Sequence, residues 1–467
     1  MASLAATLYT IGILLLQILL QYVHSSFCYI IAFVPTRRKT DKQISTTDGA
    51  PETVQTRHID AIDIADIVAP FGYIVREHVV TTEDGYILVI HKLEKKSNHS
   101  KNSKKIAYFH HGMLTNSELF VLGDEKSKTL PFILADLDYD VWLGNNRGNK
   151  YSRKHLKLSA SDVKFWDFSL DEFAYYDIPA ILDYIKSLYR PEDKITYIGF
   201  SQGCSQLFAC LSLHPHINKY LNMFIGLSPA LIPQNLSHPI FKVIVNQTAK
   251  DANFLYNLFG RRAILSSVAF WSHILGPYYN KVVDVSLVYL FGWSGKNISN
   301  KQKQTGYPHM FSNSSVKSLI HWFQIIYTKR FQMYDETESF GRTKLSMLSS
   351  ASKNKGHRVA PFPVAHHLDV PMTLFYGDSD ILVDIERTKS LIVDQNEKMQ
   401  TKLDVVLCPG YEHMDTLWSD NVYEDVFAKV VAVMEMFHQR SKKYVVFRDT
   451  QYQRHSQETI AIYSQLK

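Results

Sequence analysis

Apolar and polar positions change their spacing along the chain in a way that predicts alternating strands and helices. Two alternating segments around the turn Glu83-Asp84-Gly85 predict a hairpin, with strands at 73–80 and 86–93. Short continuous apolar runs predict further strands at 106–114, 140–144, 195–200, 222–229, 370–377 and 403–407. Helical spacing predicts helices at 59–67, 130–136 and 170–189, the last of which leads into the strand at 195–200. The pattern therefore predicts an α/β fold with a mostly parallel sheet flanked by helices.

A long segment without strand character separates two of these strands. Residues 231–370 carry aromatic, helical patterns instead, at 254–279, 282–293 and 318–334. A parallel crossover needs only one helix, so most of this segment is expected to leave the sheet and form a helical cap or lid over its carboxyl-terminal edge. We call residues 231–370 the cap segment. Most of its aromatic residues are expected to pack as an ordinary core, and a subset to line an apolar tunnel.

The chemistry centres on Gly199-Phe-Ser-Gln-Gly203, which follows the strand at 195–200 and opens a helix-spaced run. The pattern G-x-S-x-G also arises by chance, but its position between a strand and a helix is typical of a nucleophile elbow. Gly199 and Gly203 remove the Cβ atoms that would collide where strand and helix approach the turn. We therefore predict that Ser201 is a catalytic nucleophile, provided that an acid and a histidine follow later in the chain.

Candidate partners for Ser201 follow the last two predicted strands. Asp378, Asp380 and Asp384 come after the strand at 370–377, and the loop position favours Asp378 or Asp380. His413 follows the strand at 403–407, and beyond it only His438, in a predicted terminal helix, and His455, in a polar tail, remain. The order serine, aspartate, histidine is that of α/β hydrolases. In such a triad the histidine removes the serine proton, the aspartate orients the imidazole, and no metal or other cofactor is required.

Two flanking stretches complete the sequence-based site. The strand at 106–114 contains His111-Gly-Met-Leu114, and its loop is expected to face the elbow, so that the backbone N–H groups of Met113 and Gln202 bind the oxyanion. The stretch 145–155 that follows the next strand is polar and poor in aromatic residues, so we predict a loop outside the core.

The amino-terminal region differs from the rest. No Asp, Glu, Lys or Arg occurs between Met1 and Val34, and residues 8–34 are mostly apolar. We expect residues 1–36 to anchor the chain in a membrane, because a cleaved signal peptide would begin with positive charge and carry a shorter apolar core. Arg37, Arg38, Lys39 and Lys42 follow this segment, so the positive-inside rule places the remaining chain in the cytosol.

The sequence is compatible with more than one geometry of this anchor. A straight helix over the 27 residues 8–34 would reach about 40 Å, whereas the hydrocarbon core of a bilayer is about 30 Å thick. Polar residues near its middle fit either a tilted span or a hairpin in one leaflet, and a hairpin could also sit on a lipid-droplet monolayer. A buried helix of the globular domain is the alternative.

Composition narrows the class of protein. The chain has 467 residues, of which 46% are hydrophobic, enough for one large domain with an insertion. We expect a linker at 37–57, a core at 58–230 and 371–438, and a polar tail at 439–467. The net charge of +6 is dispersed, which disfavours nucleic-acid binding. The four cysteines lack disulfide or metal-site spacing, and five N-x-S/T sequons exceed the number expected by chance only slightly.

The motifs together resemble a known family, the acid-lipase branch of the α/β hydrolases, which includes gastric and lysosomal lipases and fungal steryl ester hydrolases. The resemblance runs from about residue 58 to residue 438, and the matching stretches begin at Thr81, His111, Phe132, Tyr139, Phe165, Gly199 and Tyr411. It implies an α/β-hydrolase fold with a cap, the triad Ser201, Asp380 and His413, and oxyanion donors at Met113 and Gln202. It thereby selects Asp380 from the three aspartates.

Within this family the chain looks most like the fungal membrane-anchored steryl ester hydrolases. Phe200 stands where the secreted lipases carry histidine, and Ser315–Gln324 in the cap segment is similar to the fungal pattern. Unlike secreted relatives, the chain has no cysteine between residues 211 and 407 and keeps a long uncharged anchor. The resemblance implies an esterase that cleaves steryl esters at a lipid droplet, the ER or another membrane, with the plasma membrane as an alternative site. A triacylglycerol lipase and, from another class, a non-catalytic membrane scaffold are the alternatives.

Overall fold

The computed structural model describes residues 61–96, 105–234, 236–264, 275–336 and 359–442. The predicted anchor (1–36) and linker (37–57) and nearly all of the predicted tail lie outside these residues. Among the described residues, no helix combines the length and the apolar character needed to cross a membrane.

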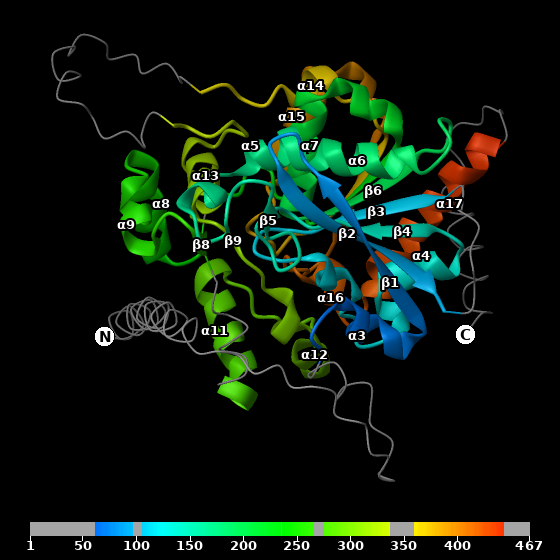
Figure 1. The fold of residues 1–467 in the computed structure, drawn as a ribbon, viewed down its shortest axis with the longest axis horizontal. Coiled ribbons are helices and arrows are strands. Elements are labelled where there is room, and N and C mark those ends of the chain that lie inside the picture. The colour runs from blue at the N-terminus through cyan, green and yellow to red at the C-terminus, as the bar shows by residue number, and fades with distance from the viewer. Residues whose placement is uncertain (1–60, 97–104, 235, 265–274, 337–358, 443–467) are drawn as a thin grey trace.

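A large sheet forms the centre of the structure (Figure 1). Its strands follow the order β1-β2-β4-β3-β6-β7-β10-β11, and β5 pairs with β2 at the side. The strands are β1 (Tyr73–Thr81), β2 (Tyr86–Lys95), β3 (Ile106–His110), β4 (Asp140–Leu143), β5 (Lys154–His155), β6 (Ile195–Phe200), β7 (Leu221–Leu227), β10 (Met372–Gly377) and β11 (Leu403–Cys408). From β4 onward in this order the strands run parallel, whereas β1, β2 and β5 are antiparallel to their neighbours. The predicted α/β fold and hairpin are therefore confirmed.

Helices cover both faces of this sheet. Successive residues of a strand point to opposite faces, so they pack in two separate hydrophobic cores, one on each side of the sheet. On one face Ile106 and Tyr108 of β3 pack in a cluster with α6 (Ile178–Ser187) and α7 (Gln202–Leu213), and on the other Ala107 and Phe109 pack in a cluster with α4 (Leu130–Asp136) and α17 (Ala428–Lys442). Figure 1 shows these two layers above and below the strands. The helices of the layers are α3 (Ile64–Val68), α4 (Leu130–Asp136), α5 (Leu170–Glu172), α6 (Ile178–Ser187), α7 (Gln202–Leu213), α14 (Val364–His367), α15 (Ile385–Val393), α16 (Asp415–Trp418) and α17 (Ala428–Lys442).

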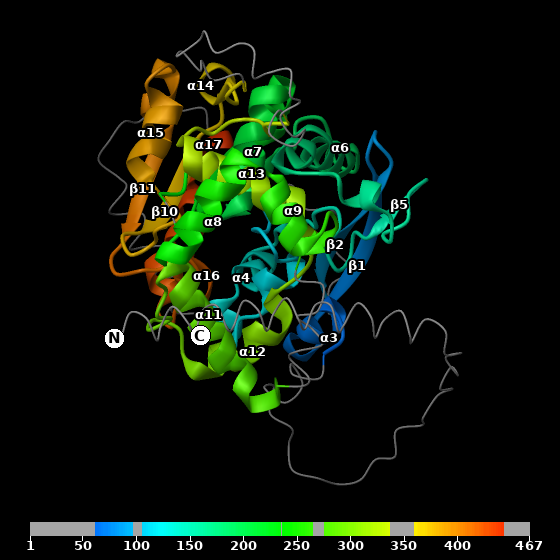
Figure 2. The ribbon, with the colours of Figure 1, turned by 90° about the vertical axis from the view of Figure 1, so that its left-hand side faces the viewer.

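The cap segment contributes a group of helices at one side of the sheet. They are α8 (Pro239–Lys250), α9 (Asn253–Phe259), α11 (Tyr279–Phe291), α12 (Asn300–Met310) and α13 (Val316–Thr328), with a short ribbon of β8 (Ala263–Ile264) and β9 (Ser314–Ser315). Figure 2 shows these helices facing the viewer in front of the sheet. The helix predicted to begin at 254 ends at Phe259, because Gly260 adopts a positive φ of 78° and β8 follows. The division into core and cap stays a prediction.

One prediction from polarity is wrong. The first part of the stretch 145–155 is not outside the core, because residues 145–149 and Ser152 are buried, whereas Lys150, Arg153 and Lys154 are exposed. Arg147 makes hydrogen bonds to Asp177 at 2.6 and 2.8 Å and to Asp84 at 2.6 and 3.0 Å. A polar segment can be buried when its groups find partners in the fold, which its composition alone does not reveal.

The long helix predicted at 170–189 is interrupted. Between α5 and α6, residues Phe173–Asp177 form a π-helical turn, and Asp177 at its end accepts the hydrogen bonds from Arg147. The π turn therefore belongs to the same buried network as the segment 145–155. Single π turns are rare and occur frequently at functional sites.

Candidate active site

Ser201 lies at the sharp turn between β6 and α7. Its φ of 53° and ψ of −119° place it in a conformation that residues other than glycine rarely adopt. A Cβ added to Gly203 would lie 2.1 Å from the carbonyl oxygen of His110, and one added to Gly199 would lie 2.9 Å from the backbone nitrogen of Cys204. These close approaches are the geometry of a nucleophile elbow, in which a strained turn presents the serine hydroxyl.

The structure brings one of the three candidate aspartates to His413. The Nδ1 atom of His413 donates a hydrogen bond of 2.6 Å to Oδ2 of Asp380, while the other carboxylate oxygen accepts from the backbone N–H of Leu382 at 2.9 Å. Asp378 instead accepts from the N–H of Gly410 at 2.7 Å, and Asp384 caps α15 by accepting from the N–H of Arg387 at 3.1 Å. Asp380 alone of the three thus orients the imidazole.

The loops that carry Asp380 and His413 meet at the ends of β10 and β11. A Cβ on Gly377 would lie 1.9 Å from the carbonyl oxygen of Tyr411, so only glycine permits this approach. The carbonyl oxygen of His413 accepts a 2.8 Å hydrogen bond from the Ser228 hydroxyl, which follows β7. Three strand ends therefore hold the histidine.

The side chain of His413 lies between aromatic rings from the core and the cap segment. Trp293 stacks on the imidazole with ring centroids 5.0 Å apart and planes at 8°, and Phe200 contacts it at 5.1 Å and 52°. Ser201, Asp380 and His413 are only 8%, 4% and 3% exposed. Charges that form in such a water-poor site interact more strongly than they would in water.

The loop after β3 passes beside Ser201. A Cβ on Gly112 would lie 3.0 Å from the Cβ of Ser201, and Met113 follows directly. Gln202 is the first residue of α7, where backbone N–H groups lack partners within the helix. This arrangement places the predicted oxyanion residues Met113 and Gln202 on the two segments that flank Ser201.

A pair of stacked histidines supports that loop from behind. His110 bonds to the hydroxyl of Tyr108 at 2.6 Å and to Oδ1 of Asn146 at 2.8 Å, while Nδ1 of His111 donates to the carbonyl oxygen of Gly112 at 2.8 Å. Burial lowers the pKa of His110 to about 4 and that of His111 to about 3. Both rings are therefore neutral at pH 7, which lets them act as acceptors.

The buried polar residues 145–149 supply partners of these histidines. The N–H of Asn146 and the amide of Asn149 donate to Nε2 of His111 at 3.1 and 3.2 Å, and Gln206 of α7 donates to Asn146 at 2.9 Å. This network joins the loop after β3 to α7, and so joins the two segments that carry Met113 and Gln202. Sequence reasoning missed it, although the density of asparagines directly after a buried strand was a signal.

A second set of contacts ties the His413 loop to the cap segment. The carboxylate of Glu412 accepts hydrogen bonds at 2.8 Å from the backbone N–H groups of Ser294 and Gly295, and Asn297 donates to Asp415 at 2.7 Å. Burial raises the pKa of Asp415 to about 6. Trp293, Glu412 and Asn297 were not predicted as site residues, because nothing in their spacing links residues 118 positions apart.

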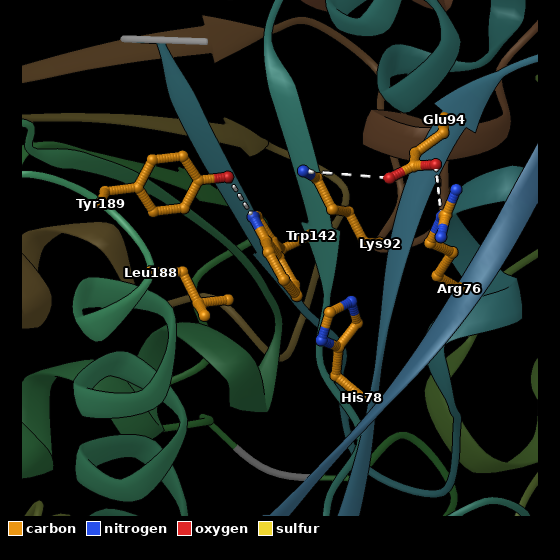
Figure 3. A pocket seen from close by; sticks show the side chains of 7 residues that line it. All are labelled: Arg76, His78, Lys92, Glu94, Trp142, Leu188 and Tyr189. Carbon is orange, nitrogen blue, oxygen red and sulfur yellow. Dashed lines mark hydrogen bonds and ion pairs between the residues drawn. The ribbon is translucent and has the colours of Figure 1, made fainter. Parts of the chain in front are cut away.

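A surface pocket of about 280 Å³ lies elsewhere, over the antiparallel edge of the sheet (Figure 3). It is lined by Arg76, His78, Lys92, Glu94, Trp142, Leu188 and Tyr189. Its charged groups pair with one another, with Arg76 and Glu94 at 2.6 Å, and β4 and β3 separate β2 from the elbow strand β6. The pocket therefore plays no part in the chemistry of Ser201.

A family model described as the alpha/beta hydrolase fold matches residues 108–420, and one described as a partial alpha/beta-hydrolase lipase region matches residues 64–124. A probable lipase of Schizosaccharomyces pombe is 41% identical over 391 residues, which cover 84% of this chain and 83% of that protein.

The names of two more distant relatives specify a lipid substrate. Human lysosomal acid lipase/cholesteryl ester hydrolase is 29% identical over 388 residues, covering 80% of this chain and 91% of that protein. Rat gastric triacylglycerol lipase is 29% identical over 382 residues, with the same two coverages.

Proposed function

This chain belongs to the α/β-hydrolase fold family and is a carboxylic ester hydrolase, and we propose that it cleaves steryl esters to free sterol and fatty acid. The proposal assigns Ser201 as the nucleophile, His413 as the general base and acid, and Asp380 as the residue that orients the histidine. Met113 and Gln202 supply the backbone N–H groups for the oxyanion. The coarser activity, hydrolysis of lipid esters, follows from the family and its lipase relatives.

The proposed reaction has two halves. His413 takes the Ser201 proton while the serine oxygen attacks the ester carbonyl, and the N–H groups of Met113 and Gln202 stabilise the negative charge on the carbonyl oxygen. Collapse of this intermediate breaks the ester bond, and His413 returns the proton to the leaving sterol. Water then attacks the acyl-serine, His413 accepts a proton from it, and the fatty acid leaves as Ser201 regains its proton.

The observation that carries the mechanism is the 2.6 Å hydrogen bond between His413 and Asp380. It joins residues from the loops after two neighbouring strands. Asp378 and Asp384 instead accept hydrogen bonds from the backbone N–H groups of Gly410 and Arg387. A buried aspartate on Nδ1 leaves Nε2 of the imidazole as the atom that exchanges protons with serine.

Two classes of substrate are candidates for this site, steryl esters and triacylglycerols. Aromatic side chains around His413 favour an apolar substrate, and the human relative named a cholesteryl ester hydrolase supports a steryl ester. The rat gastric triacylglycerol lipase has the same sequence identity to this chain, 29%, and supports triacylglycerol as the alternative substrate. Hydrolysis of cholesteryl oleate and of triolein by the purified full-length protein in mixed micelles separates the two.

The test uses Ser201→Ala as the matched control. We expect cholesterol release by the wild type and none by Ser201→Ala. Rapid cleavage of triolein without sterol release would establish the alternative substrate, and full activity of Ser201→Ala would contradict the proposed mechanism itself.

We also propose that residues 8–34 attach the enzyme to a membrane or lipid droplet, with the catalytic domain in the cytosol. The support is the uncharged apolar sequence, followed by Arg37, Arg38 and Lys39. A fluorescent protein fused to residues 1–45 tests this. A signal at the droplet rim supports a hairpin, a signal at the ER or plasma membrane supports a spanning helix, and a diffuse cytosolic signal would contradict the proposal.

A further inference from the structure

A tryptophan of the cap segment is hydrogen-bonded to a residue of the oxyanion hole. Nε1 of Trp322 in α13 lies 2.6 Å from Oε1 of Gln202. An indole nitrogen can only donate, so the side-chain oxygen of Gln202 is the acceptor. Both side chains are buried, with 7% and 2% exposure, so water does not compete for this hydrogen bond.

The two partners come from different parts of the fold. Gln202 opens α7 directly after Ser201, whereas Trp322 lies in α13, 120 positions later. Trp322 and Ile325 of α13 pack in the core cluster that includes α7, whereas Val316, Ile320 and Phe323 pack in a separate cluster with residues of α8 and α9. The helix therefore lies between the core and the rest of the cap, with one face toward each.

The position of α13 is set independently of Gln202. At its first turn Ser315 accepts a 2.9 Å hydrogen bond from the N–H of Ser318, and the Ser318 hydroxyl donates to the carbonyl oxygen of Phe168 at 3.2 Å. Lys317 forms an ion pair with Asp167 at 2.9 Å. These contacts fasten the amino end of α13 to the core, and Trp322 extends from a helix that is already placed.

We propose that Trp322 is a positioning residue that holds Gln202 in the geometry required for the oxyanion hole, and thereby links the placement of the cap to catalysis. Fixing the Gln202 side chain restrains the first residue of α7, whose backbone N–H must face the developing negative charge. A donor displaced from this geometry stabilises the transition state less, although it binds the uncharged ester almost as well. This inference rests on the proposed role of Ser201 and Gln202.

The same cap also contacts the loops on the other side of the nucleophile. Leu114, next to Met113, and Leu382, which bonds Asp380, both pack against the cluster that contains Ile320 and Phe323 of α13. A displacement of α13 would therefore change the surroundings of both loops, while the hydrogen bond from Trp322 is its direct polar contact with an oxyanion residue.

The test compares Trp322→Phe with Trp166→Phe in the full-length protein. Trp166 is a matched control, because it is also buried and its indole donates to a carbonyl oxygen, that of Ala160 at 2.8 Å. With p-nitrophenyl butyrate, a small soluble ester, we expect Trp322→Phe to slow acylation about ten-fold with KM changed less than about two-fold. Trp166→Phe is expected to acylate at the wild-type rate.

A double-mutant cycle with Gln202→Met tests whether Trp322 affects acylation through its hydrogen bond to Gln202. Gln202→Met removes the acceptor and leaves the indole in place, so it also tests the contact if Trp322→Phe does not fold. We expect it to slow acylation by a similar factor, and the double variant to be no slower than Gln202→Met alone. Losses that multiply in the double variant would overturn the inference.

Two further outcomes separate this inference from the proposed function. Wild-type acylation by a folded Trp322→Phe variant, with Ser201→Ala inactive on the same ester, would overturn the inference alone. Activity retained by Ser201→Ala would overturn both. The choice of a small ester makes the result independent of whether the natural substrate is a steryl ester or a triacylglycerol.

Discussion

Trp293 stacks on His413 with ring centroids 5.0 Å apart and ring planes only 8° from parallel. The tryptophan belongs to the cap segment and lies two residues after the end of α11, whereas the histidine lies in the loop after β11. Glu412, beside the histidine, is bound by the two residues that follow Trp293. One face of the imidazole is therefore covered by the same cap loop that fastens the histidine loop.

Replacing Trp293 by alanine should loosen His413. An aromatic stack contributes about 1 kcal/mol, so we expect kcat for p-nitrophenyl butyrate to fall about five-fold. Trp293→Phe is the control, because it keeps an aromatic ring and Nε1 of Trp293 has no hydrogen-bond partner among the described residues. Steady-state kinetics of both variants check this, and an unchanged kcat in Trp293→Ala would show that the ring only covers the site.

Asp380 and Asp378 provide a direct comparison of two neighbouring carboxylates. Asp380→Asn should lower kcat by about 10⁴, because the uncharged amide no longer stabilises the imidazolium and can present its NH2 group to Nδ1, which selects the wrong imidazole tautomer. Asp378→Asn should keep nearly full activity, since an asparagine oxygen can still accept from the N–H of Gly410. Parallel assays on one ester decide the assignment, and an inactive Asp378→Asn beside an active Asp380→Asn would reverse it.

Arg147 should contribute more to stability than its position in a polar loop suggests. Arg147→Met leaves Asp177 buried without its partner, which should lower the free energy of unfolding by about 3–5 kcal/mol. Arg190→Met breaks the more exposed pair with Asp193 and should change the free energy of unfolding little, because water screens an exposed ion pair. Urea denaturation followed by circular dichroism measures both, and equal losses would argue against a special role of the buried network.

His110 and His111 should make the fold sensitive to acid. Their pKa values in the fold are about 4 and about 3, whereas an unfolded histidine titrates near 6.5. Below pH 6.5 the unfolded chain therefore binds more protons than the folded one. The contribution of these neutral histidines to the free energy of unfolding is fully present above pH 6.5 and is lost as the pH falls toward 4 and 3. The loss is on the order of 3 kcal/mol for each histidine.

The measurement is the free energy of unfolding at several pH values between 7 and 4, for the wild type and for a His110→Gln/His111→Asn variant. The wild type should lose stability more steeply over this range, because the variant has neither group to protonate. Parallel curves would contradict the assignment of neutral, buried histidines.

Several features could be predicted from local sequence alone. The hairpin of β1 and β2, the helix α4 and the elbow strand β6 follow from apolar spacing and turn residues, because neighbours along the chain determine such elements. The motif around Ser201 and the order Ser201, Asp380, His413 could also be read from the sequence, and the α/β-hydrolase fold they indicated is confirmed. Residue type alone left Asp378, Asp380 and Asp384 open.

Tertiary structure decided what depends on contacts between distant residues. Asp380 meets His413 because parallel strands β10 and β11 end at one edge of the sheet. Arg147 is buried because Asp177, on a π turn 30 positions later, and Asp84 accept its hydrogen bonds. Trp293 and Trp322 reach His413 and Gln202 only after the cap helices have packed. The sequence by itself determined the local elements and the kind of chemistry, because these depend on near neighbours, whereas the partners of each candidate catalytic group depend on packing across the fold.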